Sequence, residues 1–169
     1  MNMTPTEFTI PVSQVRPIPF RDLAAQDASL RSEIRAAVDG VLASGKYVGG
    51  EHGAALEHEL GAALGVEHVV VVNSGTDALV LALRAAGIGA GDEVIVPAYT
   101  FIATASAVSL AGAVPVFVDS PPGRFTIDPS AVSAAVTTRT RAVIAVHLFG
   151  EPADMDALAG VCERNDLLL

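Results

Sequence analysis

The chain has 169 residues, is 51% hydrophobic, and carries 10 basic against 19 acidic residues, for a formal net charge of −9. This length and a mean hydropathy of +0.48 allow one sizeable core and exclude a disordered tail. The acidic balance argues against nucleic acid as a partner. Because no signal sequence or long apolar run is evident and Cys162 is the single cysteine, we expect a cytoplasmic protein without a membrane segment.

Two amphipathic helices follow a leader. Residues 1–17 contain three prolines, which indicates an extended segment. Apolar residues recur every four positions over 30–42, which predicts a helix ending near Gly45. The same spacing over 56–64 predicts a second helix that stops at Gly65.

Short β-branched runs bounded by Gly, Pro or Asp predict four strands. These lie at 69–72, 94–96, 114–118 and 142–146. Continuous apolar runs are typical of strands buried on both faces, as in a parallel sheet covered by helices. Helix-like segments alternate with them at about 76–87, 101–111, 130–136 and 153–165. The order βαβαβαβα predicts an α/β fold with right-handed crossovers.

This pattern divides the chain into a leader at 1–17, N-terminal helices at 18–66 and an α/β domain at 67–169. The apolar run at 167–169 predicts the start of a further strand. A sheet ending on such a short exposed strand would present an adhesive edge. We therefore expect the α/β domain to be incomplete and the chain to be truncated at its C-terminus.

The first candidate site is the turn that leads from the strand at 69–72 into the next helix. Such a junction directs free backbone N–H groups and the positive end of a helix dipole toward a ligand. Gly75 would let a phosphate approach the backbone, and the Thr76 hydroxyl could donate to it. Ser74 and Asp77 also have the spacing of a capping box, which needs no ligand. The residues alone leave both interpretations open.

Two aromatic residues follow the strand at 94–96. In an open α/β sheet, ligands bind outside the carboxyl ends of the strands, so Tyr99 or Phe101 could lie flat on a planar cofactor. Either ring could instead cap the hydrophobic core.

Polar residues follow the next two strands. His147 could act at the same sheet edge, or it could be a hydrogen-bonded structural residue. Asp119 has a comparable alternative as a turn former. Asp128 before Pro129 is typical of a helix N-cap. Three strand ends thus bring a phosphate-type turn, an aromatic residue and a histidine to one edge.

With these motifs, the chain resembles the DegT/DnrJ/EryC1/StrS family of sugar aminotransferases from Ile18 to Leu169. The matching segments are IPF at 18–20, SGKYVGG at 44–50, NSGTDALVLAL at 73–83, GAGDEVIVPAYTFIATASAV at 89–108, GAVPVFVD at 112–119, TIDP at 126–129 and HLFGEPADMDAL at 147–158. The resemblance implies the N-terminal part of the large domain of the type I, aspartate aminotransferase-like, pyridoxal phosphate fold, with a mostly parallel sheet flanked by helices.

Residue by residue, the resemblance implies that Gly75, Thr76 and the Asp77 backbone hold the phosphate of pyridoxal 5'-phosphate. It implies that Phe101 stacks on the pyridine ring, with Tyr99 the second choice. It also places His147 beside the cofactor in a supporting role. Two departures from the family pattern are Glu151, where a neutral residue is usual, and Gly50 with Glu51, where Gly-Pro is common.

The segment containing Lys46 and Tyr47 would, by the same resemblance, shape the substrate entrance near a homodimer interface. The implied reaction moves an amino group from glutamate or glutamine to a nucleotide-linked keto sugar. The Schiff-base lysine and the acid that protonates the pyridine nitrogen would lie beyond Leu169. Lys46 is the one lysine of the chain and indicates a solvated loop cation. We therefore expect no catalytic residue here and no transaminase activity from these residues alone.

Other functions remain open at this point. A member of the same family could be a sugar dehydratase or a non-catalytic regulator. A nucleotide-binding α/β module without pyridoxal phosphate would use the turn at Gly75 for its own phosphate, although no GxGxxG or GxxxxGK[ST] motif follows a strand. A structural or pseudogene product without a ligand is a further alternative.

Overall fold

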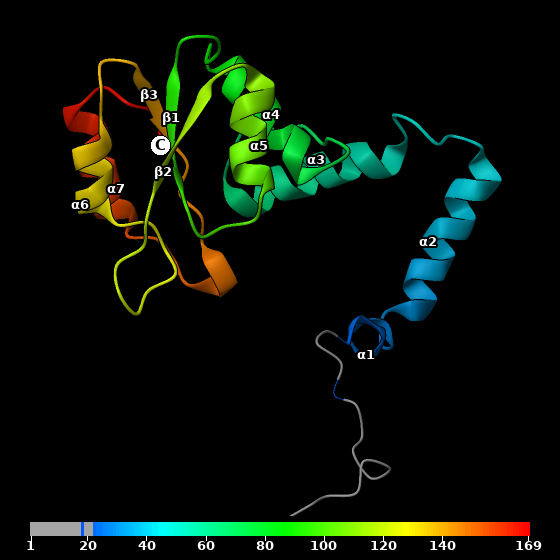
Figure 1. Ribbon diagram of the computed structural model, residues 1–169. Helices are drawn as coiled ribbons and strands as arrows, with labels where there is room; N and C mark the ends of the chain where they lie inside the picture. The colour runs from blue at the N-terminus through cyan, green and yellow to red at the C-terminus, as the bar shows by residue number, and fades with distance from the viewer. Residues whose placement is uncertain (1–17, 19–21) are drawn as a thin grey trace, which may run out of the picture. The chain divides into compact units, whose positions relative to one another are not determined.

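The computed structural model describes residue 18 and residues 22–169, so the predicted leader at 1–17 lies outside the described residues (Figure 1). Contacts divide the chain into two units with a boundary between Val69 and Val70. The first unit contains helices α1 (Leu23–Asp27), α2 (Arg31–Ser44) and α3 (Glu51–Leu64). The second unit is an α/β unit and contains all the regular strands of the described chain.

Both predicted N-terminal helices are confirmed, and glycine ends each of them. Gly45 follows α2 at φ 66°, and its N–H donates to the carbonyl of Val41. Gly65 follows α3 at φ 68°. Residues other than glycine rarely adopt this left-handed backbone conformation, which explains why the helices stop at these positions. No residue of α2 is buried.

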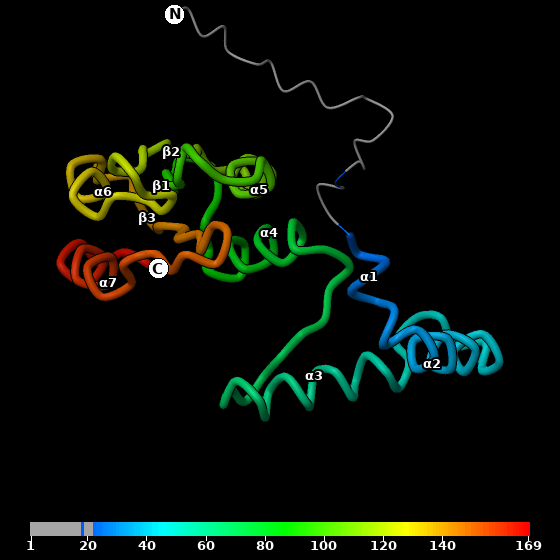
Figure 2. Tube along the Cα trace, turned by 90° about the horizontal axis from the view of Figure 1, so that it is seen from below, coloured from blue at the N-terminus to red at the C-terminus, as the bar shows by residue number. Residues whose placement is uncertain are grey.

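A three-stranded parallel sheet forms the centre of the α/β unit. Its strands are β1 (Glu93–Pro97), β2 (Val114–Val118) and β3 (Thr140–Val143). Their order is β2-β1-β3, and Figure 2 shows β1 between the other two. Every residue of β1 is buried, which confirms the expectation that its apolar run is covered on both faces.

Helices cover both faces of this sheet (Figure 1). Helices α4 (Gly75–Ala85) and α5 (Ala103–Ala111) pack on one face, and α6 (Pro129–Ala135) and α7 (Met155–Arg164) on the other. Val94 and Val96 join the core on the α4 and α5 side, whereas Ile95 joins the core of α6 and α7. This alternation follows from the two-residue period of a strand. The predicted α/β class is confirmed.

The predicted strand at 69–72 is wrong. The structure assigns no strand there, and the exposed fraction of Val70 is 78%. β-Branched residues favour extended backbone, but this propensity alone does not place a segment in a sheet, and the described sheet consists of β2, β1 and β3. The regular elements of the α/β unit therefore begin with α4 rather than with a strand.

Two other predicted strands are shorter or displaced. The strand expected at 142–146 is β3, which begins at Thr140 and ends at Val143. The run at 167–169 makes one parallel bridge, between Ala142 and Leu168, in which the Val143 N–H donates to the Leu168 carbonyl at 2.8 Å. This run is therefore beside β3, as expected of a beginning strand, but forms no regular strand.

The expectation that Asp128 caps a helix is also confirmed. Asp128 caps α6 by accepting the Ser130 N–H at 2.8 Å, with Pro129 at the first helical position. Cys162 is buried in α7, and burial raises the pKa of its thiol. Among the described residues, no helix has the length and apolar character required to span a membrane.

A buried carboxylate joins β1 to the start of β3 at the amino end of the sheet. Glu93 is 5% exposed; it accepts the Thr137 hydroxyl at 2.5 Å and pairs with the Arg139 guanidinium, whose Nε donates at 2.9 Å. The hydrogen bond from Thr137, followed by that from Arg139, lowers the pKa of Glu93 below its ordinary value. These contacts stabilise the ionised form in the folded chain.

We expect Glu93→Gln to destabilise the fold at pH 7 and to weaken its acid sensitivity. Because the folded pKa is lowered, ionised Glu93 contributes its full stability above the ordinary pKa of 4.5, and loses it as the pH falls through the folded value. Urea unfolding at pH 7 and at stepwise lower pH measures both effects. Glu163→Gln, at an exposed glutamate of α7, is the control. Equal acid sensitivity of the Glu93 variant and the parent would contradict this account.

Candidate functional site

The first turn of α4 has a local cap made by Ser74. The Ser74 backbone is extended, and its hydroxyl oxygen accepts the Asp77 N–H at 3.1 Å and donates to Asp77 Oδ2 at 2.8 Å. The capping interaction expected from the sequence therefore forms. It holds the Asp77 carboxylate on the Ser74 hydroxyl and occupies the Asp77 N–H, which the family resemblance had assigned to a phosphate.

Two donors of the same turn remain open. Among the described residues, the N–H groups of Gly75 and Thr76 have no recorded acceptor, and neither does the Thr76 hydroxyl. A methyl group built on Gly75 would meet nothing within 4 Å. The turn therefore offers two backbone donors, a hydroxyl and the positive end of a helix dipole to an anion. These features fit a phosphate group.

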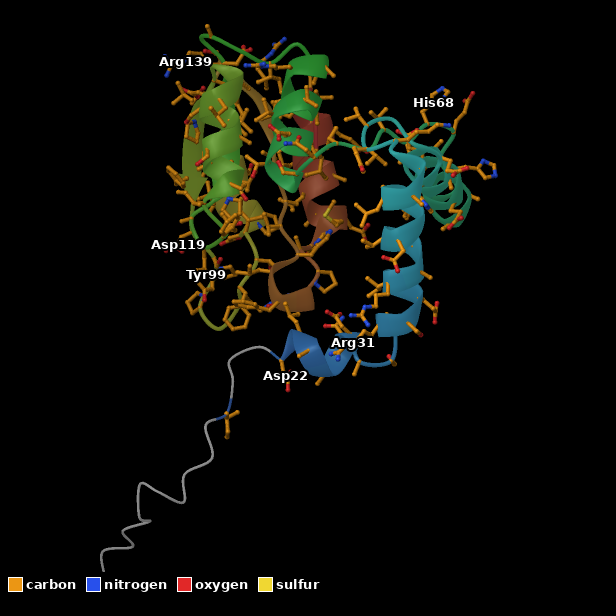
Figure 3. The ribbon with its side chains drawn as sticks, turned by 90° about the vertical axis from the view of Figure 1, so that its right-hand side faces the viewer. Asp22, Arg31, His68, Tyr99, Asp119 and Arg139 are labelled. Atoms are coloured by element: carbon orange, nitrogen blue, oxygen red, sulfur yellow. The ribbon has the colours of Figure 1, made fainter. Side chains whose placement is uncertain are left out.

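The chain direction places this turn at the carboxyl edge of the sheet. Helix α4 precedes β1 through a short turn and so runs antiparallel to it, with its N-terminus beside the end of β1. Figure 3 shows Tyr99, after β1, and Asp119, after β2, at one end of the α/β unit and Arg139 at the other. Ligands of open α/β sheets bind at the carboxyl edge.

The aromatic residues after β1 do not cap the core. The exposed fraction is 73% for Phe101 and 50% for Tyr99. Phe101 has no ring contact among the described aromatic residues, whereas Tyr99 contacts two other rings. Phe101 therefore has a free ring face, as stacking on a planar ligand requires.

His147 follows β3 and has a structural contact. It is exposed, and its Nδ1 accepts the backbone N–H of Ala153 at 3.0 Å. In the neutral imidazole this contact places the proton on Nε2. The ring is thus held by its own chain while Nε2–H remains a donor.

Asp119 is used locally as a turn former. Its carboxylate accepts the Ser120 N–H at 2.8 Å, and its carbonyl accepts the Asp128 N–H at 3.3 Å. The Ser120 Oγ is a buried atom without a partner, and no other such side-chain atom occurs among the described residues. The contacts of Asp119 are therefore those of a turn-forming residue.

Lys46 and Tyr47 belong to the N-terminal unit. The Lys46 N–H donates to the Ser44 hydroxyl at 3.1 Å just after α2. Tyr47 is 68% exposed. The Lys46 ammonium forms no ion pair with a described carboxylate.

A group at the carboxyl edge was missed from the sequence. The rings of Tyr99, Phe125 and Phe149 contact one another, with centroids 5.5 to 6.2 Å apart. Glu151 bonds both Arg124 and the backbone of Phe125. Each aromatic residue follows a different strand, a signal that could have indicated their meeting, but Phe125 lies seven residues beyond β2 in a loop whose course the sequence does not predict.

The fold and site define a class of protein: a parallel α/β unit with a phosphate-type turn at the carboxyl edge of its sheet. The sequence profile of the DegT/DnrJ/EryC1/StrS aminotransferase family matches residues 28–169, and the chain belongs to that family. The predicted family is thus confirmed, and the solved structures that the chain matches confirm the predicted type I, aspartate aminotransferase-like fold.

Curated relatives carry transaminase and regulatory names. The chain is 51% identical over 150 residues to dTDP-3-amino-3,4,6-trideoxy-alpha-D-glucose transaminase of Streptomyces venezuelae, covering 89% of this chain and 40% of that protein. It is 44% identical over 152 residues to the pleiotropic regulatory protein of Geobacillus stearothermophilus, covering 90% and 41%. The chain therefore spans about two fifths of the length of these relatives.

Solved structures of aminotransferases have the same fold. DesV of S. venezuelae, in complex with a ketimine intermediate, superposes with a TM-score of 0.85 at 50% identity, covering 89% of this chain and 41% of that one. NtdA of Bacillus subtilis, with the cofactor PMP bound, gives a TM-score of 0.78 at 37% identity, covering 81% and 32%.

Proposed function

We propose that this chain supplies the phosphate-binding part of a pyridoxal 5'-phosphate-dependent aminotransferase. The proposed enzyme transfers an amino group from glutamate or glutamine to a nucleotide-linked keto sugar and acts as a homodimer. Family membership and the names of the relatives support the reaction class. The observation that carries the proposal is the open first turn of α4, with unpaired Gly75 and Thr76 donors.

In this function the cofactor, when bound, supplies an electron sink for bonds at the amino-bearing carbon. The N–H groups of Gly75 and Thr76 and the Thr76 hydroxyl bind its phosphate. The Asp77 N–H is already bonded to Ser74, so its part is to rigidify the turn. Phe101 orients the pyridine ring by stacking. The imidazole of His147 is held by the Ala153 N–H, so its Nε2–H is available as a donor beside the cofactor.

Binding of pyridoxamine 5'-phosphate tests the proposal. This form of the cofactor has no aldehyde, so it cannot react with Lys46. In a ¹⁵N-labelled chain we expect millimolar binding that shifts the backbone amide signals of Gly75 and Thr76, because an incomplete set of contacts gives weak affinity. Inorganic phosphate should shift the same signals.

Pyridoxamine without phosphate is the matched control ligand and should leave both amides unchanged. Signals of α3 residues, such as Gly53, report nonspecific effects. Saturating shifts confined to other parts of the chain would contradict the proposed site, and equal shifts by pyridoxamine would contradict its phosphate selectivity.

A further inference from the structure

Three aromatic rings form an exposed cluster at the carboxyl edge. Tyr99 follows β1, Phe125 lies in the loop after β2, and Phe149 follows β3. Phe125 and Phe149 pack edge to face at 5.5 Å and 86°. The exposed fractions are 50% for Tyr99, 46% for Phe125 and 76% for Phe149. Exposed apolar groups gathered in this way mark binding surfaces more often than isolated ones do.

The Glu151 carboxylate links the turn that carries Phe149 to the loop that carries Arg124 and Phe125. Glu151, directly after the turn that carries Phe149, pairs through Oε1 with the Nε of Arg124. Its Oε2 accepts the Phe125 N–H at 3.3 Å. Phe149 has a left-handed backbone at φ 55°, which is rare for an aromatic residue and persists where surrounding contacts hold it. Glu151 therefore positions the Arg124 guanidinium and the backbone of Phe125.

Arg124 is the one arginine at this edge in the described α/β unit. Arg84 and Arg164 lie in the last turns of α4 and α7, and Arg139 and Arg141 lie at the start of β3. All four are at the amino edge. The pair with Glu151 uses the Arg124 Nε, so its two terminal nitrogens have no recorded acceptor among the described residues. They can donate to a phosphate oxygen.

Carboxylates at the same edge are engaged locally. Asp77 accepts from the Ser74 hydroxyl, Asp119 from the Ser120 N–H, and Asp154 from the Ala157 N–H. The net charge of −9 repels anions from most of the surface. An anion at this edge therefore needs a cationic side chain that is held in place and has free donors. Arg124 meets both conditions.

We propose that Arg124 and the Tyr99–Phe125–Phe149 cluster form a subsite for a nucleoside diphosphate, and that Glu151 is its positioning residue. The rings pack against the nucleobase, and the terminal Arg124 nitrogens bind the diphosphate. The link to an enzyme substrate rests on the proposed function, in which the keto sugar is carried on such a group. The subsite uses residues separate from the phosphate turn at Gly75.

Titration of the ¹⁵N-labelled chain tests this subsite. The probes are thymidine diphosphate, uridine diphosphate, glucose 1-phosphate and pyrophosphate. We expect both nucleoside diphosphates to shift the Arg124 Nε–H and Phe125 N–H signals saturably. Of the two tyrosines of the chain, Tyr99 belongs to the cluster, so its ring signals should shift in the same titrations. Stronger binding of glucose 1-phosphate than of the nucleoside diphosphates would overturn the nucleobase assignment.

Variants separate the parts of the subsite. Arg124→Gln should weaken all phosphate probes about tenfold, whereas Arg164→Gln, at the opposite edge, should not. Phe149→Ala should weaken the nucleoside diphosphates about fivefold and leave pyrophosphate unchanged. Glu151→Gln should weaken pyrophosphate binding, and the double variant with Arg124→Gln should bind pyrophosphate no more weakly than Arg124→Gln alone, since Glu151 acts on the diphosphate through Arg124.

Three results would overturn the proposal: no shift at about 10 mM probe, which excludes useful affinity; equal losses in the Arg124 and Arg164 variants; or additive losses of pyrophosphate affinity in the double variant. Failure of the proposed function is distinguishable, because pyridoxamine 5'-phosphate is read at the Gly75 and Thr76 amides and the nucleoside diphosphates are read at Arg124 and Phe125.

Discussion

Gly75→Ala is expected to abolish measurable binding of pyridoxamine 5'-phosphate while leaving the fold intact. A methyl group at this position meets no atom of the chain within 4 Å, so the helix accommodates it. Alanine in a helix is favoured over glycine by up to about 1 kcal/mol, so the variant should be at least as stable as the parent. The methyl group, however, occupies the space through which a phosphate reaches the Gly75 and Thr76 N–H groups. We expect affinity to fall at least about tenfold.

Amide shift titration measures the affinity for pyridoxamine 5'-phosphate, and urea unfolding measures the stability of the variant. Gly53→Ala in α3 is the matched control, because an added methyl group there also meets nothing within 4 Å. It should retain full binding. Unchanged affinity in the Gly75 variant would remove this turn as the phosphate site, and unfolding of the variant would show that the glycine serves the fold.

Leu158→Ala should cause the largest loss of stability among the substitutions considered. The Leu158 side chain is fully buried and packs from α7 into the core that contains Ile95 and Val132. Truncating a buried leucine costs about 2–5 kcal/mol, because transfer free energy is lost and a cavity remains. The free energy of unfolding from urea titration, followed by circular dichroism, measures the change.

Leu110→Ala is the control for this substitution. Leu110 lies in α5 with 58% of its surface exposed, so its loss should change the free energy of unfolding by no more than about 0.5 kcal/mol. Similar losses in the two variants would mean that α7 does not dock on the sheet as described.

Much of the secondary structure was predictable because its causes are local. Gly45 and Gly65 end their helices through backbone conformations that depend on the residue itself. Asp128 and Ser74 cap helices through contacts two or three residues away. The buried run of β1 indicated a strand covered on both faces. The Ser74 cap before α4 is likewise a property of one short segment, so the sequence predicted it, while it left the phosphate interpretation of the turn open.

The sequence by itself determined the helix ends, the central strand and the turn at Gly75, since each depends on neighbours along the chain. Only the tertiary structure decided that 69–72 lies outside the described sheet, because β-propensity alone does not place a segment beside a strand. Likewise, it alone joined Arg124 to Glu151, and Tyr99 to Phe125 and Phe149, across 26 to 50 positions of sequence. Those contacts depend on how three loops end at one sheet edge, which no residue pattern specifies.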